Sequence, residues 1–452
     1  MSRRPTFIRL CLALVILAAG AARPADAQGL LTGARRIGIG GLSIDRTGNL
    51  RRYNAAYRAV PARVGQPSEP KLTIPIPLGL VRFFRDHPLL RLDEDPTFNP
   101  SSPGFNAVEI VNFALNPPLL YDLSKAPAPT HDAIFTSGRD WFLVDLGEAP
   151  KLVPEDPYEI GGTIRPLDPG FGIGGLRVSV MGWAHDDVRL SLGNTMRGFL
   201  RDADPLQSNT RYSLLGDATL EFGFAPTVGF AGRLVGNATA GLYVGGAFHY
   251  YLGVGYAQLT SDGGLTTGNT IVRGPNPATA DARGLIQYAK PGQAFGHGTG
   301  GDVGAVLVAG PIEIGVGVND LGATIIWPDT RRDSVFYRGS GSSRLVANHL
   351  QAKTTLPVSY LANVTCTLGS TTLGADALNG GRGTTVHVGG EHRISVLALR
   401  GGVARDPRRR FEFGYGAGLR LGTFSIDAGA WTHTNALSSE RAVTMVTSLS
   451  IY

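Results

Sequence analysis

Two short motifs in the chain resemble cofactor-binding or catalytic signatures. Gly170-Phe-Gly-Ile-Gly-Gly175 has the glycine spacing of a dinucleotide-binding loop, but it opens an alternating strand and no helical pattern follows. Gly339-Ser-Gly-Ser-Ser343 resembles a serine-nucleophile turn, but it lies in a polar stretch typical of a flexible linker. The nine histidines include no zinc-binding pair four residues apart. The sequence therefore predicts no cofactor, no metal site and no enzyme.

A second group of residues has the chemistry to contact a solute. These polar side chains alternate with apolar ones along predicted strands, and successive side chains of a strand point to opposite faces. We expect them to face the interior of a closed sheet, where they either pair with one another and with the N-terminal segment or contact a ligand directly. They are Glu221, Arg233, His249, Tyr251, Glu313, Lys353, His387, Arg420 and Asp427.

The strands that would position these residues follow one pattern. Phe411-Glu-Phe-Gly-Tyr-Gly-Ala-Gly-Leu-Arg-Leu421 alternates bulky apolar residues with glycine or charge, and segments like it recur back to about Phe171. Glycine accounts for 62 of 452 residues, about twice the usual share of ~7%. After residue 27 no apolar run reaches the length of about 18 residues that a membrane helix needs. These features predict an all-β fold, a transmembrane antiparallel β-barrel.

The connections between the predicted strands alternate in length. Short ones such as 185–187 are followed by long ones such as 260–300, as in outer-membrane barrels, which have short periplasmic turns and long outer loops. Thirteen strands can be counted from Phe171 onward, and Trp141-Phe-Leu-Val-Asp-Leu146 makes fourteen. A count of sixteen is the alternative, if the segment at Leu72 and another also pair.

Two prolines interrupt the longest predicted strands. Pro226 lies within Ala218–Leu234, and Pro357 lies within Leu350–Leu368. Proline has no N–H for the strand ladder, so each marks a bulge, a kink or a gap in the wall. A gap would provide a lateral opening, whereas a bend would only mark where long strands rise past the bilayer. Unbroken pairing across either proline would exclude a gate there.

The N-terminal part of the chain has a different composition. Residues 1–27 are predicted to be a signal peptide, with arginines before an apolar run and Ala25-Asp-Ala27 as the cleavage site. Their removal leaves 38 basic and 35 acidic residues, a net charge of +3 that gives no case for nucleic-acid binding. We expect residues 28–136 to form a plug or a periplasmic segment and residues 137–452 to form the barrel.

One N-terminal motif resembles a known family. Ala34-Arg-Arg-Ile-Gly-Ile-Gly-Gly-Leu42, followed by Asn54-Ala-Ala56, is similar to the opening of the FadL-like family of outer-membrane transporters for hydrophobic compounds. That family reads Arg-Ala-x-Gly-Met-Gly-Gly-Ala and then Asn-Pro-Ala. The resemblance implies an N-terminal hatch inside a fourteen-stranded barrel and sideways exit of hydrophobic molecules through a kinked wall strand.

Taken together, these features predict a protein of the bacterial outer membrane that passively transports small hydrophobic compounds, fatty-acid-like or aromatic. Its partners would be outer-membrane lipids and the transported molecule. The alternative is a non-transporting scaffold whose partners are proteins of a secretion or conjugation assembly, and an outer-membrane enzyme is the third hypothesis. An apolar cavity leading to a gap in the wall favours the transporter, whereas a lumen filled by the plug and paired charges favours the scaffold.

Overall fold

The computed structural model describes most of the chain from residue 157 onward and parts of the N-terminal region. The described residues are 33–63, 70, 72–76, 85, 121–124, 134–137, 142–145 and 157–452, apart from 45, 47, 48, 203, 270–277, 291–293, 338–340, 382, 408 and 435–440. The predicted signal peptide, residues 1–27, lies outside them. Within these ranges, no helix has both the length and the apolar character to cross a membrane.

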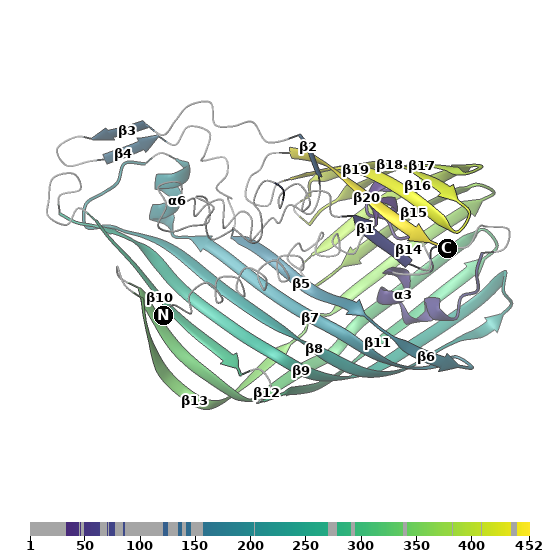
Figure 1. Cartoon of the computed structure of the whole chain (residues 1–452), viewed down its shortest axis with the longest axis horizontal. Helices are drawn as coiled ribbons and strands as arrows, with labels where there is room; N and C mark the ends of the chain where they lie inside the picture. The colour runs from purple at the N-terminus through teal and green to yellow at the C-terminus, as the bar shows by residue number, and fades with distance from the viewer. Residues whose placement is uncertain are drawn as a thin grey trace.

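Most of the strands belong to one antiparallel 18-stranded sheet that curls into a barrel (Figure 1), which confirms the predicted fold class. The strands of this sheet are β1 (Leu72–Ile76), β2 (Tyr121–Ser124), β5 (Tyr158–Leu167), β6 (Gly170–Ile173), β7 (Leu176–Leu192), β8 (Arg211–Gly236), β9 (Ala240–Thr267), β10 (Ala278–Ala289), β11 (Gly296–Ala309), β12 (Ile312–Tyr337), β13 (Gly341–Thr355), β14 (Ser359–Leu368), β15 (Thr371–Asn379), β16 (Thr384–Ile394), β17 (Leu397–Arg405), β18 (Phe411–Leu421), β19 (Phe424–Thr434) and β20 (Arg441–Ile451). A separate two-stranded sheet contains β3 (Ile134–Ser137) and β4 (Phe142–Asp145).

The strands pair with their neighbours in the order of the sequence. The wall starts with β5 and β6, continues from β7 to β20, and ends with β1 and β2, which both pair with β20. Four positions are each shared by two strands, namely β5 with β6, β10 with β11, β13 with β14, and β1 with β2. The 18 described strands therefore occupy fourteen wall positions, the number predicted from the sequence.

Two of the fourteen positions are not filled by the segments that the sequence suggested. β7 pairs without a break through His185-Asp-Asp187, where a turn was expected, because these polar residues lie in register with both β5 and β8. The segment at Trp141 forms β4 and pairs only with β3. The missing positions are occupied by β5 with β6 and by β1 with β2, so the wall also includes residues before 137. Residues 260–300, expected to be a loop, contain the end of β9, all of β10 and the start of β11.

The two faces of the wall differ in chemistry, as the alternation predicted. On β18, Phe411, Phe413 and Tyr415 are about half exposed on the outside, whereas Gly414 and Gly418 are buried inside. The outward face of β8 is likewise apolar, with Phe224 and Phe230 exposed. A wall that is apolar outside and polar inside is the arrangement of a membrane barrel.

The wall is much taller on one side than on the other (Figure 1). β15 to β20 contain 9 to 11 residues each, about the length that a strand needs to cross a bilayer. β8, β9 and β12 contain 26, 28 and 26 residues. One end of the barrel is closed by turns of two or three residues such as Gly174-Gly175, and we call it the short-turn end. The taller strands rise at the opposite end, where β7 and β8 are joined through α6 (Asn194–Arg201).

Three of the four shared wall positions are interrupted by only a few residues. β5 and β6 are separated by Asp168-Pro169, β10 ends at Ala289 and β11 begins at Gly296, and β13 and β14 are separated by Leu356-Pro-Val358. Pro357 therefore lies at an interruption. Pro226 does not, because β8 continues through it and pairs it with Val180 of β7. On its other side, the pairing of β8 with β9 leaves out Ala225 and Pro226 and resumes in the same register at Thr227, so the strand is continuous but this ladder has a local gap at the proline.

The N-terminal residues 33–63 lie inside the barrel and contact several wall strands. They contain α2 (Ala34–Gly38), α3 (Asn49–Tyr53) and a 3-10 helix η2 (Ala55–Arg58), and we call them the plug. Two buried ion pairs join the plug to the wall, Arg35 to Glu391 at 2.7 Å and Arg46 to Glu313 at 2.5 Å.

Glycines in the wall let the backbone of the plug approach very closely. A Cβ atom at Gly402 would lie 2.1 Å from the carbonyl oxygen of Ile39, and one at Gly317 would lie 2.1 Å from that of Tyr53. These distances are far below van der Waals contact, so no other residue fits without moving the plug. The adjacent Gly401 has no atom within 4 Å of its Cβ position.

This difference between neighbours predicts the outcome of a paired substitution. Gly402→Val forces the plug away from the wall and is expected to destabilise the folded barrel by about 1–3 kcal/mol or more, as overpacking does. Gly401→Val is the matched control and leaves stability nearly unchanged. Urea unfolding of the purified proteins in detergent micelles, followed by tryptophan fluorescence, measures both. Equal unfolding midpoints for the two variants would contradict the close contact.

Candidate functional site

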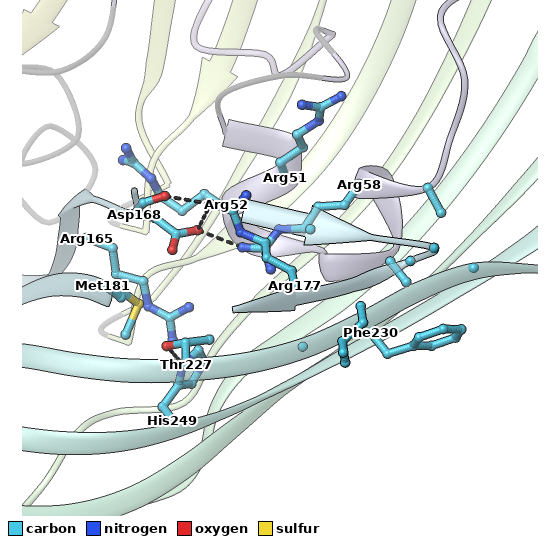
Figure 2. A pocket seen from close by; sticks show the side chains of 18 of the residues that line it. Arg51, Arg52, Arg58, Arg165, Asp168, Arg177, Met181, Thr227, Phe230 and His249 are labelled. Carbon is cyan, nitrogen blue, oxygen red and sulfur yellow. Dashed lines mark hydrogen bonds and ion pairs between the residues drawn. The ribbon is translucent and has the colours of Figure 1, made fainter. Parts of the chain in front are cut away.

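A cavity of about 710 Å³ lies between the plug and the wall strands β5 to β9 (Figure 2). Its volume is within the range of small-molecule sites, about 300–1,000 Å³. Arginines from the plug and from the wall make up much of its lining. The lining residues are Arg51, Arg52, Arg58, Ala59, Arg165, Pro166, Asp168, Gly172, Gly174, Gly175, Leu176, Arg177, Met181, Thr227, Gly229, Phe230, Ala231, Gly232 and His249.

Arg165 on β5 is held in a closed network of charges. Its guanidinium group donates to both carboxylate oxygens of Asp302, at 2.6 and 3.0 Å, and to Asp320 at 2.8 Å. His249 Nε2 lies 2.9 Å from Asp302, and His249 Nδ1 lies 2.7 Å from the hydroxyl oxygen of Thr227. Each of these charges is buried and has an opposite partner. The network therefore holds Arg165 and His249 in place at one side of the cavity.

A second carboxylate, Asp168, stands at the interruption between β5 and β6. Arg58 of the plug and Arg177 of β7 both contact its Oδ2 atom, at 2.9 and 3.4 Å. Burial lowers the pKa of Arg58, and the charge of Asp168 acts in the opposite direction. Figure 2 shows Arg52, Arg58 and Arg177 around Asp168, with His249 on the opposite side of the cavity. Two arginines thus share one carboxylate.

Above the cavity, toward the taller strands, lies an aromatic cluster of buried residues. Its large members are Met181, Trp183, Tyr251, Tyr256 and Trp327. Trp183 meets Tyr251 edge to face at 5.5 Å between ring centroids, and Tyr256 stacks on Trp327 at 5.2 Å. Met181 belongs to the aromatic cluster and also lines the cavity, so the two are in contact at this residue.

Trp327 lies beside two of the wall interruptions. A Cβ atom at Gly296, the first residue of β11, would lie 2.8 Å from its ring, so the indole packs directly against the backbone there. Leu356, which starts the interruption between β13 and β14, belongs to the same cluster. The indole nitrogen donates to Glu221 at 3.3 Å.

Six of the nine residues predicted to face the lumen are buried inside the barrel and have polar partners there. They are Glu221 with Thr354 and Trp327, His249 with Asp302 and Thr227, Tyr251 with Asp320, Glu313 with Arg46, His387 with Asp376, and Asp427 with Arg400 and Ser425. Only His249 lines the cavity. Arg420 is partly exposed at the short-turn end, where its guanidinium lies 3.7 Å from the centroid of the Tyr452 ring.

The expectation fails for Lys353 and Arg233, which are exposed. In β13 it is Thr354, not Lys353, that points inward and donates to Glu221 at 2.6 Å. After Pro357 the buried positions of β14 are odd-numbered, beginning with Ser359. The interruption shifts the alternation by one residue, so the pattern read across Leu350–Leu368 assigns the wrong face before it. Arg233 lies where β8 reaches its turn and its register with β9 shifts.

Sequence reasoning missed Arg58, Arg165 and Arg177 as members of the site. The glycine motif Gly170–Gly175 does line the cavity, as β6 and the turn to β7, where Gly174 and Gly175 have φ of 59° and 92°. This motif therefore serves a tight turn rather than a cofactor. The sequence does place an arginine on each side of this motif, Arg165 before it and Arg177 after it, and this pair could have indicated the site.

No protein-family model matches the chain, and no curated protein matches it. Solved structures that match include the deltaS2S3 mutant of the monoaromatic hydrocarbon channel TodX (10% identity, 71% of this chain and 86% of that chain, TM-score 0.32). Others are a Pseudomonas aeruginosa FadL homologue (14%, 70% and 86%, 0.29) and the Ralstonia pickettii toluene transporter TbuX (10%, 66% and 89%, 0.29). At such low TM-scores the fold assignment depends on the strand pairing of this chain itself.

The network around Arg165 predicts a measurable loss of stability. Asp302→Asn keeps the shape of the side chain but removes the charge that Arg165 and His249 share. Breaking a buried pair in this way costs about 3–5 kcal/mol. The control is Glu159→Gln, because the Glu159–Arg189 pair at 3.1 Å is exposed and is worth about 1 kcal/mol or less. Urea unfolding in micelles measures both, and a control as destabilised as Asp302→Asn would contradict the buried network.

Proposed function

We propose that this chain is an outer-membrane channel through which small hydrophobic compounds, aromatic or fatty-acid-like, pass without energy input. The apolar outer surface of the wall supports a position in a membrane. The short-turn end would face the periplasm, because outer-membrane barrels have their short turns there. The taller strands would then rise from the outer surface of the cell.

One observation carries the proposal: the cavity adjoins the aromatic cluster at Met181. It begins at Met181, within that cluster, and it extends to the turn Gly174-Gly175 at the short-turn end. An apolar solute entering from the taller end would meet aromatic rings before it reaches the cavity. Aromatic and aliphatic linings are typical of sites for apolar ligands.

The wall interruptions offer places where a solute could leave the barrel sideways. The gap at Asp168-Pro169 adjoins the cavity, and the gaps after Ala289 and at Pro357 adjoin the aromatic cluster. An interrupted strand lacks part of its ladder, so the wall there opens at lower cost than within β8 or β9. We propose no exit at Pro226, because β8 is continuous there and only its pairing with β9 is missing, at Ala225 and Pro226.

A scaffold without transport is the second hypothesis. The plug and the buried ion pairs fill much of the lumen, which a scaffold would also do. A cavity of about 710 Å³ beneath the aromatic cluster has no role in a solid lumen, and it therefore favours the channel. The absence of enzymatic activity stays a prediction.

A substitution at Met181 tests the route. Met181→Trp fills the junction between the aromatic cluster and the cavity, and a barrier higher by about 1.4 kcal/mol slows passage about tenfold. We expect cells producing this variant to take up radiolabelled toluene about tenfold more slowly than cells producing the unchanged protein. Val180→Trp is the matched control, because Val180 is exposed on the outer face.

The comparison also needs cells that lack the protein, and equal amounts of folded barrel in each outer membrane. If the unchanged protein gives no more toluene uptake than its absence, the channel hypothesis is wrong. If both tryptophan variants transport equally well, the route does not pass Met181.

A further inference from the structure

The connection between β17 and β18 is strongly basic. Residues 405–410, which we call the basic turn, read Arg-Asp-Pro-Arg-Arg-Arg, with four arginines and one carboxylate. The basic turn joins the 9 residues of β17 to the 11 residues of β18 at the end of the barrel opposite the short-turn end. Strands of this length just cross a bilayer, so the basic turn is expected at the level of the lipid headgroups.

The carboxylate of the basic turn is bound within the turn itself. Asp406 accepts a hydrogen bond from the backbone N–H of Arg410 at 2.7 Å and pairs with the guanidinium group of Arg410 at 3.3 Å. Two backbone hydrogen bonds of 2.9 Å, from residue 406 to residue 410 and from residue 409 to residue 406, close the same loop. The acid of the turn therefore does not neutralise Arg405 or Arg409.

Arg405 and Arg409 are exposed, and neither guanidinium group forms a hydrogen bond or an ion pair with a described residue. The loop after β15 packs against the turn, because a Cβ atom at Gly383 would lie 2.7 Å from Cβ of Pro407. The basic turn thus presents two positive charges on a hydrogen-bonded and supported backbone. Guanidinium groups bind phosphate oxygens well, since they donate two parallel hydrogen bonds.

An apolar surface begins directly beside these charges. Arg405 lies on the outer face of β17, and its register partner on β18 is Phe411, whose ring centroid lies 6.0 Å from the guanidinium carbon. Phe413 and Tyr415 are about half exposed on the same outer face, and Val386 of β16 pairs with Arg405 from the other side. Aromatic residues are typical of the membrane–water interface. From the turn downward, the outer face therefore changes from guanidinium groups to aromatic rings, as a lipid changes from phosphate to acyl chain.

We propose that the basic turn and the adjoining outer face of β16 to β18 bind a phosphorylated, multiply acylated glycolipid of the outer leaflet, of the lipid A class. Its phosphate lies at Arg405 and Arg409, and its acyl chains lie along Phe413 and Tyr415. This inference rests on the proposed orientation of the barrel in the outer membrane and not on transport.

Both halves of the surface are needed to select this partner. A free phosphate ion would contact the arginines and leave the aromatic face unused, whereas an uncharged lipid would leave the arginines without a counter-charge. Positive charge close to a membrane surface attracts anionic headgroups over a distance of about 10 Å, so the turn also gathers the lipid before contact. Bound lipid would hold the low side of the wall at the level of the headgroups.

The experiment measures lipid binding to the purified full-length barrel in detergent. Native mass spectrometry follows titrations with lipid A, with phosphatidylglycerol and with inorganic phosphate. Lipid A is expected to bind at least about tenfold more tightly than phosphatidylglycerol, because it brings a second phosphate and more acyl chains to the same surface. Inorganic phosphate is expected to bind more weakly than either lipid.

Substitution of the two exposed arginines tests the site directly. Arg405→Gln/Arg409→Gln should weaken lipid A binding about 30-fold, because each arginine beside an anionic lipid contributes a factor of about five. Arg409→Gln alone should weaken it about fivefold. The matched control is Arg233→Gln/Arg344→Gln, which removes the same two charges at exposed positions near the short-turn end of β8 and on β13. The control should bind lipid A as the unchanged protein does.

Three outcomes would overturn the inference: phosphatidylglycerol bound as tightly as lipid A, inorganic phosphate bound as tightly as lipid A, or equal affinity for lipid A in the double variant and its control. The first would mean a general patch for anionic lipids, and the second an inorganic-anion site. Toluene uptake without lipid A binding would leave the channel standing and exclude the lipid site. Lipid A binding without toluene uptake would contradict the channel and leave the lipid site standing.

Discussion

The contact between the backbone of the plug and the inner surface of the wall is the constraint on which the rest of the structure depends. At Gly317, Gly402 and Gly414 the plug carbonyls lie where a Cβ atom would be. A wall of larger residues would keep the plug out of the lumen, and the ion pairs that now join the two would not form. The high glycine content is thus partly a requirement of this contact and not only of the turns.

The second feature is the pairing of charged side chains inside the barrel. Most interior charges have an opposite partner at short distance, as Glu391 has in Arg35 and Arg400. Such pairing removes the large penalty of an isolated charge in a low-dielectric interior. The cavity departs from this rule, because Arg52 has no described partner and Arg58 shares Asp168 with another arginine. Charged groups held in this way in a cavity are candidates for a functional site.

The wall interruptions connect these two features. A continuous strand fixes which side chains point inward, but a break allows the phase to change. At Pro357 the inward positions change from even to odd numbers, and at Asp168 a carboxylate turns toward the plug. The breaks therefore place side chains that regular alternation would not. They also separate the tall half of the wall from the part that matches a bilayer in length.

The sequence alone determined the barrel and its apolar outer face, because a period of two is a local property of the chain. Its count of fourteen agrees with the wall, but two of the segments it counted are not separate wall positions. The alternation also predicted correctly that His249 lies inside the barrel. Only the tertiary structure decided that β1 and β5 supply wall positions, that Lys353 points outward, and that Arg52 and Arg177 meet in one cavity. These outcomes depend on pairing between segments far apart in the chain, which no local pattern encodes.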